Sequence, residues 1–269
     1  MSDKNDALLY HYTDWTALRG ILTEGKFWAS DWRMLNDTTE FKLGREILRE
    51  VIENELDLCR STSAKAKRIE QIRDAVVSIE SGIADGAQSL FVTSFTEAGD
   101  DLGQWRSYAS DGRGVSIGFT RATLREAGGA FRQVEYDEVR HRRKLRTALQ
   151  TQLGKPTTND VLLTAKANAL IRVCLSYKHS GFASEREHRL ISTVSSSLKF
   201  RSVADAVIPY REFPMKRIDP ENEASPPAIA EILIGPRSHA AAEGTLRTLL
   251  RVVYGEETPP VTRSTIPYR

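Results

Sequence analysis

The chain has few cysteines and lacks the long apolar runs that a membrane-spanning helix needs. Its 269 residues include only two cysteines, Cys59 and Cys174, which are far apart and form no CxxC pair. The sequence therefore predicts two buried thiols, and neither a disulfide framework nor a cysteine-based zinc site. No stretch approaches the ~18 consecutive apolar residues of a transmembrane helix. Because residues 1–6 also lack the features of a secretory signal, we expect a cytoplasmic protein with no membrane partner.

The chain also lacks an excess of charge of one sign. Its 38 lysines and arginines face 36 acidic residues, for a net charge of +2, so nothing attracts it globally to nucleic acid or lipid. Hydrophobic residues make up 40% of the chain, which is typical of a globular protein. There is no GxGxxG or Walker motif and no internal repeat. The length would fit one large domain or two small ones, and we expect a single domain over residues 1–269.

Short strands and pairs of helices follow one another along the chain. Strands are expected at Leu8–Tyr12, Phe27–Ala29, Leu90–Phe95, Gly114–Phe119, Phe131–Tyr136, Arg189–Val194, Ala206–Ile208, Glu231–Ile234 and near Val261. Short helices are expected at Trp15–Glu24 (capped by Asp14), at Leu102–Tyr108 and after Thr120, and helical hairpins near 37–85 and 137–178. Because the strands and helices do not alternate as regular βαβ units, the pattern favours an α+β fold over a Rossmann sheet.

Several polar and aromatic residues lie at the expected ends of strands. His11, Tyr12 and Thr13 end the first strand, where a histidine can hydrogen bond a ligand. Ser94 and Phe95 end another strand, and an aromatic there can stack on a planar ring. For each group the alternative is an ordinary structural role, and for His11 alone a half-buried structural histidine is the better interpretation.

A short helical segment and one strand entrance offer further candidates. Trp105 and Tyr108 are three residues apart, so they share a helix face, for which core packing is the default. Glu185, Glu187 and Arg189 would lie on one face of an extended chain just before an apolar run. Two carboxylates and an arginine make a poor core, so we favour a functional site over a solvated, salt-bridged edge.

Two further polar groups have stronger structural explanations. Asn36 and Asp37, with Glu40 in the following turn, are typical of a helix N-terminus. One predicted helix carries a run of basic residues, which are usually a solvated face. Because this run is not balanced by the acids near it in the sequence, a phosphate-rich nucleic-acid partner is a second interpretation; its members are Arg140, Arg142, Arg143 and Arg146.

The opening LLYHYTDWTALRGILTEGKFWAS resembles the start of ADP-ribosyltransferase-like proteins. There, a strand ending in a histidine triplet precedes a helix of the form LxxILxxG. The ordered set HYT, LND with Glu40, SF, WxxY, GVxIGF, ExExR and IGP is similar to the bacterial family called domain of unknown function 2971. The resemblance spans roughly Leu8 to Val253. It implies an ADP-ribosyltransferase-like split antiparallel sheet with helical hairpin insertions.

The transferase resemblance implies roles for individual residues. His11 would contact the nicotinamide ribose of NAD, with Tyr12 and Thr13 beside it, and Ser94 and Phe95 would support the nicotinamide pocket. Glu187 would be the catalytic acid. From their spacing on one strand face, we expect Glu185 to be its helper and Arg189 to orient a carboxylate or bind an NAD phosphate. The aromatic that stacks on nicotinamide stays open among Tyr12, Phe95, Trp105 and Tyr108.

The chemistry expected of this site is cleavage of the nicotinamide–ribose bond of NAD. The reacting ribose develops positive charge, which a nearby carboxylate stabilises without a metal. The leading hypothesis is ADP-ribosyl transfer to a protein or nucleic-acid acceptor, in a toxin or antiphage effector. The alternatives are an NAD glycohydrolase, an RNA-acting phosphotransferase or nuclease, and a non-catalytic module that senses nucleotides or nucleic acids.

Overall fold

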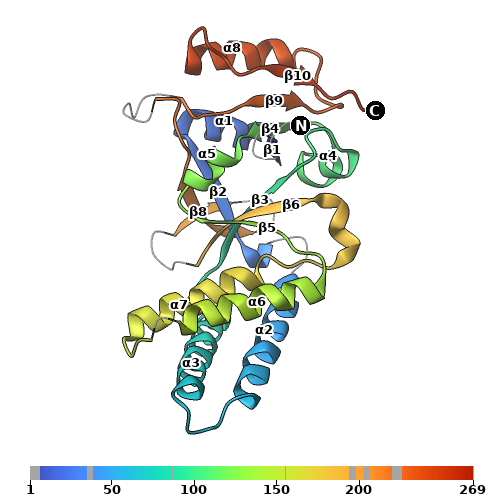
Figure 1. Ribbon diagram of the computed structural model, residues 1–269. Helices are drawn as coiled ribbons and strands as arrows, with labels where there is room; N and C mark the ends of the chain where they lie inside the picture. Colours follow the sequence, from blue (N-terminus) through green and yellow to red (C-terminus); the bar gives the residue numbers. More distant parts are fainter. Residues whose placement is uncertain are drawn as a thin grey trace.

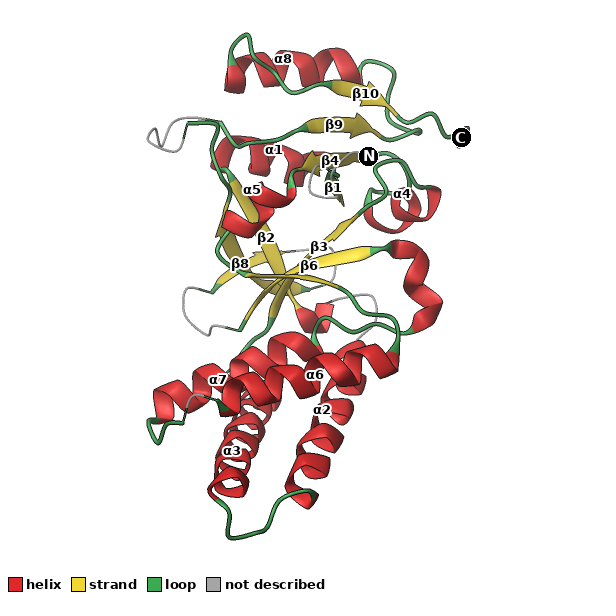
Figure 2. Ribbon diagram, viewed as in Figure 1, coloured by secondary structure: helices red, strands yellow, loops and turns green. Residues whose placement is uncertain are grey.

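The computed structural model describes residues 7–34, 39–86, 88–154, 156–193, 198–202, 206–219 and 226–268. Figure 1 shows an elongated molecule with a sheet at its centre and helices at both ends. Figure 2 shows the same division by element type, with the strands between the two helical ends. The chain therefore combines α and β structure in segregated regions, as the sequence predicted.

Ten strands form one sheet, and nearly all of their pairings are antiparallel. The order is β10-β9-β4-β1-β3-β2-β8-β7, while β6 pairs with β3 and β5 pairs with β6. The parallel exception is β9 with β10. The strands are β1 (Leu9–Thr13), β2 (Lys26–Asp31), β3 (Phe91–Thr96), β4 (Val115–Phe119), β5 (Ala130–Gln133), β6 (Glu187–Ser192), β7 (Lys199–Ser202), β8 (Val207–Pro214), β9 (Glu231–Ile234) and β10 (Val261–Arg263).

Strand β3 pairs with both β1 and β2, and these two strands separate from each other beside it. Along one edge it pairs continuously with β6. Along the other edge it meets β1 through Tyr10 and Thr96, and β2 through Ser30 with Val92 and Asp31 with Phe91. Between these contacts β1 and β2 both leave β3, so the middle of its edge faces an opening in the sheet.

Helix α1 (Trp15–Glu24) connects the two strands that part, and its ends follow local rules. The Asp14 carboxylate accepts a hydrogen bond from the Ala17 amide, and Gly25 adopts the left-handed conformation (φ 64°) that glycine favours. The predicted helix, its cap and its stop are all confirmed. Because α1 is short and firmly ended, β1 and β2 are held at a fixed separation.

The two predicted helical hairpins combine into one four-helix group with its own core. It contains α2 (Thr39–Asp57), α3 (Ala64–Ala84), α6 (Glu138–Leu153) and α7 (Asp160–Cys174). The helices α2 and α7 cross closely at Gly44, where a Cβ would lie 2.5 Å from the Cys174 carbonyl oxygen. The core of this group includes Val92 and Ile191, so it covers one face of β3 and β6. The expected helix start at Asn36 and Asp37 lies outside the described residues.

A second core fills the opposite side of the sheet. It joins side chains of α1, α5 (Arg121–Glu126) and α8 (Ala242–Tyr254) with strand residues such as Phe27, Phe95 and Phe119. Helix α4 (Leu102–Tyr108) belongs to a third, small cluster, in which Trp105 packs against Tyr12 on the other face of β1. No helix in the described part of the chain is long and apolar enough to cross a membrane.

Some elements differ from the sequence expectation. Strand β7 and helix α8 were not predicted, and Ala241, which precedes α8, provides no side-chain cap. Helix α7 ends at Cys174, which leaves Lys178 in a loop rather than in the helix. The strand expected from Arg189 begins two residues earlier, at Glu187.

Candidate functional site

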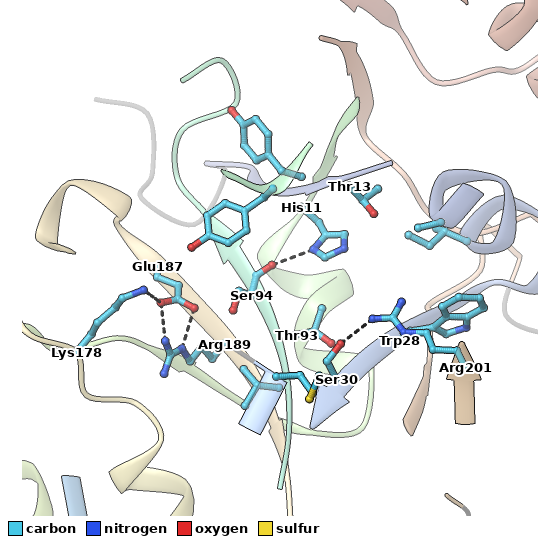
Figure 3. Close-up of a pocket in the computed structure, with 16 residues that line it drawn as sticks. His11, Thr13, Trp28, Ser30, Thr93, Ser94, Lys178, Glu187, Arg189 and Arg201 are labelled. Atoms are coloured by element: carbon cyan, nitrogen blue, oxygen red, sulfur yellow. Dashed lines mark hydrogen bonds and ion pairs between the residues drawn. The ribbon is translucent and has the colours of Figure 1, made fainter. Parts of the chain in front are cut away.

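The opening between β1 and β2 contains a cavity of about 280 Å³. Figure 3 shows His11 and Ser94 at its centre, with Glu187, Arg189 and Lys178 on one wall. Trp28, Ser30 and Arg201 form the opposite wall. His11 and Glu187, to which the transferase resemblance gives roles in one reaction, both line this cavity.

The His11 ring lies beside the part of the β3 edge with which neither β1 nor β2 pairs. Its Nδ1 lies 2.9 Å from the Ser94 carbonyl oxygen, on the edge of β3 that faces the opening. Burial, opposed by this hydrogen bond and reinforced by the positive charge of Arg201, lowers the pKa of His11. The ring is therefore neutral at pH 7. A carbonyl can only accept, so Nδ1 carries the proton and Nε2 is left as a hydrogen-bond acceptor.

The neighbours of His11 on β1 have different roles. Thr13 lines the cavity, on the same face of the strand as His11. The Tyr12 side chain is buried and lies against Trp105. Its hydroxyl donates to the Ala98 carbonyl oxygen at 2.8 Å and accepts from the Asp101 amide at 3.0 Å. These bonds hold the Tyr12 side chain to the α4 region, at the margin of the cavity that Tyr12 also lines.

Ser94 and Phe95 lie on opposite faces of β3. Ser94 contributes its carbonyl to His11 and lines the cavity. Phe95 is 1% exposed and packs behind His11, with ring centroids 5.6 Å apart. Phe95 therefore supports the histidine through the core, and the expectation that it could stack on nicotinamide is wrong because its ring is enclosed.

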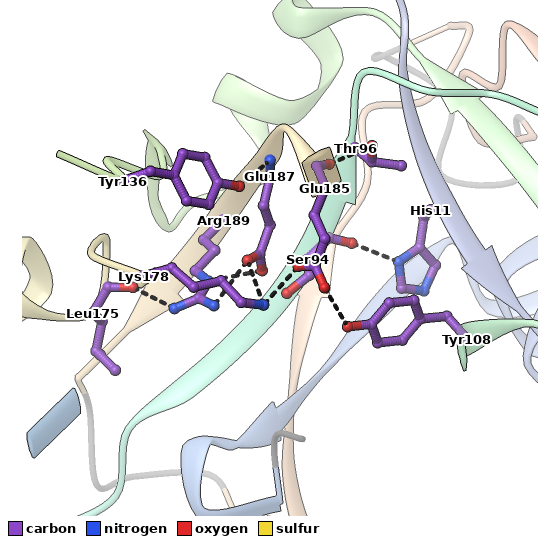
Figure 4. Close-up of polar contacts among 10 residues, drawn as sticks. All are labelled: His11, Ser94, Thr96, Tyr108, Tyr136, Leu175, Lys178, Glu185, Glu187 and Arg189. Atoms are coloured by element: carbon purple, nitrogen blue, oxygen red, sulfur yellow. Dashed lines mark hydrogen bonds and ion pairs between the residues drawn. The ribbon is translucent and has the colours of Figure 1, made fainter. Parts of the chain in front are cut away.

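Glu187 is a buried carboxylate that is bound at both oxygens. Arg189 donates to Oε1 from Nε and to Oε2 from Nη2, each at 2.8 Å, and Lys178 Nζ lies 3.5 Å from Oε2. Burial raises the pKa of Glu187, but the charges of Arg189 and Lys178 outweigh it and hold that pKa below its ordinary value. Figure 4 shows this cluster, with the Tyr136 hydroxyl accepting a hydrogen bond from the Glu187 amide (2.8 Å).

Glu185 reaches the same cluster by a different backbone path from the one expected. It ends a 3₁₀ helix (Ser180–Glu185), and Arg186 takes the left-handed conformation (φ 44°) before the strand begins. The expected extended run from 185 to 189 is therefore wrong. Lys178 Nζ nevertheless binds Glu185 Oε2 at 2.6 Å, and the Tyr108 hydroxyl lies 3.4 Å from Oε1. A small side cavity is lined by both carboxylates.

The wall formed by Trp28, Ser30 and Arg201 was not predicted. Arg201 donates to the Ser30 hydroxyl at 3.0 Å, and its guanidinium lies 5.7 Å from the Trp28 ring centroid. These residues belong to β2 and β7, which meet through β8 rather than directly. The alternation of β2 could have marked Trp28 and Ser30 as neighbours on one face, but nothing in the sequence connects them to Arg201.

Trp105 was expected among the aromatics that could bind the cofactor, and this expectation is wrong. Its side chain is fully buried, and its Nε1 donates to the Asp100 carboxylate at 2.7 Å. Tyr108, three residues later, is instead 37% exposed and lines the cavity. Of the four candidate stacking aromatics, Tyr108 is the most exposed and lines the cavity, whereas Tyr12, which also lines it, is buried.

The basic face of α6 is balanced by acids, contrary to the expectation from its sequence. Helix α2 packs beside α6 and supplies carboxylates that are far away in the chain. The ion pairs join Arg140 to Asp137 (3.4 Å), Arg142 to Glu50 (2.7 Å) and Glu138 (3.1 Å), and Arg146 to Glu55 (3.1 Å). Arg143 forms no ion pair within the described ranges. Most of the run is therefore a paired helix face.

The cavity combines groups that suit an anionic, hydroxyl-bearing ligand. Arg201 offers a positive charge at one end, and the neutral His11 offers an acceptor near the middle. At the other end the charges of Glu185 and Glu187 are matched by those of Lys178 and Arg189. Among the described residues, no group of three or more histidine, cysteine or acidic side chains is placed to hold a metal ion.

Comparisons with known proteins cover part of the chain. No curated protein and no solved structure gives a significant match. Residues 104–190 match a family model, and this segment carries Tyr108, Lys178, Glu185, Glu187 and Arg189. That family is described as protein of unknown function (DUF2971), and the match covers less than half of the chain.

Proposed function

We propose that the cavity binds NAD and that the protein cleaves its nicotinamide–ribose bond, transferring ADP-ribose to a macromolecular acceptor. The observation that carries this proposal is the placement of His11 and Glu187 in one cavity at the split of the sheet. The neutral His11 would accept a hydrogen bond from a ribose hydroxyl. The ionised, water-shielded Glu187 would face the positive charge that develops on the ribose.

Other residues of the cavity support the same ligand. Arg201 lies across the cavity from Glu187, at the place where the pyrophosphate of NAD would need a cation. Tyr108 offers a ring beside the carboxylates for the nicotinamide. The acceptor, a protein or a nucleic acid, would approach from the exposed side of Tyr108, and with water in its place the reaction becomes NAD hydrolysis.

One observation favours a second candidate function, a non-catalytic NAD-sensing module. Both oxygens of Glu187 are engaged by Arg189, and Lys178 adds a second positive charge nearby. A carboxylate neutralised in this way stabilises a cation less than a free one does. Such a site would bind the dinucleotide and change conformation without breaking it.

The experiment measures NAD binding by calorimetry and nicotinamide release by chromatography on the same preparation. The transferase proposal expects both signals, and expects His11→Ala to weaken binding ~10-fold, the scale of about one hydrogen bond. Glu126→Gln is the matched control, because Glu126 pairs with Lys216 at an exposed surface site. Binding without release would support the sensor, and no binding would contradict both.

A further inference from the structure

A second cavity lies apart from the first, in a groove between β5 and the helices α6 and α7. Its volume is about 600 Å³, within the range of ligand sites. It shares no lining residue with the cavity around His11. Phe131 and Arg132 come from β5, Arg143 and Thr147 from α6, and Val173 and Ser176 from α7 and the residues just after it.

Arg132 is a largely buried cation whose charge is not matched by a carboxylate in the described ranges. Its Nε is inaccessible to solvent and has no hydrogen-bond partner there. Burial lowers the pKa of Arg132. The residue directly opposite on β6 is Arg189, whose charge is already taken up by Glu187. The strand register therefore places a second arginine beside Arg132 instead of an acid.

Two more guanidinium groups approach the same region. Arg172 on α7 donates to the neutral hydroxyl of Thr193 at 2.9 Å, and burial together with the charge of Arg132 lowers the pKa of Arg172. Arg143 lies exposed on the α6 side of the groove and makes no ion pair with any described residue. The adjacent Lys144, by contrast, binds Glu135 at 3.0 Å. The acids that balance α6 thus leave this group of arginines uncompensated.

We propose that this groove is a binding site for a phosphate group, with Arg132 as its anchor and Arg143 as a second contact. The planar fork of a guanidinium matches phosphate oxygens in pairs. A bound phosphate would supply the missing partner of Arg132 and relieve its repulsion from Arg172. Ala148, Ala169 and Val173 add apolar lining to the groove, which suits the sugar or base attached to the phosphate. Free nucleotides and nucleic acids both present this chemistry.

The test measures binding of two probes, inorganic pyrophosphate by calorimetry and a 5′-phosphorylated ten-nucleotide oligothymidylate by fluorescence anisotropy, at low ionic strength. Arg132→Gln is expected to weaken binding of at least one probe by ~10-fold or more, and Arg143→Gln by a few-fold. Arg146→Gln is the matched control, because Arg146 lies on the same helix outside the groove and pairs with Glu55. Thermal melting of each variant checks that it is folded.

The pattern across the probes identifies the source of the phosphate. A loss for both probes supports a site open to a nucleic-acid backbone, and a loss for pyrophosphate alone supports a free nucleotide. If neither probe binds, or if Arg132→Gln and Arg143→Gln bind both probes as the wild type does, the proposal is overturned. Binding that is lost only in Arg201→Gln would place the phosphate in the first cavity and would also overturn it. Should Arg132→Gln fail to fold, the Arg143→Gln result decides.

Discussion

The substitution Glu187→Gln separates a structural role of this residue from a catalytic one. If Glu187 is the catalytic acid, as the sequence suggests, this change should leave folding intact. If Glu187 instead forms a structural ion pair with Arg189, the variant should have a lower melting temperature. The structure contains that pair, with side chains only 7% and 3% exposed. The substitution removes one charge from a buried ion pair, which typically costs about 3–5 kcal/mol because the remaining charge is left uncompensated.

The magnitude expected for Glu187→Gln lies at the lower end of this range. The amide oxygen of glutamine can still accept one hydrogen bond from Arg189, and Lys178 keeps its 2.6 Å contact with Glu185. We therefore expect a loss of about 3 kcal/mol in the free energy of unfolding, a substantial part of the 5–15 kcal/mol typical of a domain. Urea denaturation followed by circular dichroism at pH 7 measures it.

A double-mutant cycle with Arg189→Met isolates the pair itself. Each single variant leaves a buried charge without its principal partner, whereas the double variant removes both charges. The double variant should therefore be more stable than the sum of the single effects predicts, with a coupling energy of about 2–3 kcal/mol, near the upper end of the values seen for residues in contact. An unchanged unfolding free energy for Glu187→Gln, with no coupling, would refute the structural argument.

Nicotinamide release is then measured at a temperature where every variant is folded, and a further ~10²-fold loss for Glu187→Gln would indicate an electrostatic role in the reaction.

Two further predictions concern stability away from the cavity. Burial lowers the pKa of His141 to about 4, so this side chain is neutral when folded but protonated when unfolded below its ordinary pKa. Stability is therefore lost as the pH falls from about 6.5 to about 4, by about 3 kcal/mol, and His141→Leu should remove this part of the acid sensitivity in urea titrations at pH 7 and 4.5. Gly114→Ala would place a Cβ 2.2 Å from the Thr13 carbonyl oxygen and should destabilise by about 2 kcal/mol, measured by thermal melting. The control Gly244→Ala, with no neighbour within 4 Å in a helix, should be neutral or slightly stabilising, and equal melting of the two variants would contradict the steric argument.

Local signals in the sequence predicted most helix boundaries correctly. Asp14 and Thr120 each accept a hydrogen bond from a backbone amide at the start of the helix they were expected to begin. A cap depends on residues three positions apart, so it can be read from a short window. Helix α8 was not predicted because it begins without a side-chain cap. Its position between the parallel strands β9 and β10 also breaks the otherwise antiparallel pattern.

Long-range pairing determined what the sequence could not predict. The basic run on α6 looked unbalanced because Glu50 and Glu55 are about ninety residues away in the chain, although they lie beside Arg142 and Arg146 in the folded protein. The two helical hairpins were expected separately, but nothing in either one indicates that they share a core. Arg201 was missed for the same reason, since its contacts with Trp28 and Ser30 depend on β8 bringing β7 next to β2.

The cavity itself depends on the separation of β1 from β3, which the periodicity of the strands does not predict. The register pairs Tyr10 with Thr96 and Thr96 with Glu187, so alternation puts these three side chains on one face and His11 on the other. In a continuous sheet His11 and Glu187 would be separated by the backbone of β3. They line one cavity because β1 leaves β3 after a single paired position, which lets the His11 ring turn into the gap and bind the Ser94 carbonyl. A change that closed this gap would therefore remove the site while leaving every strand in place.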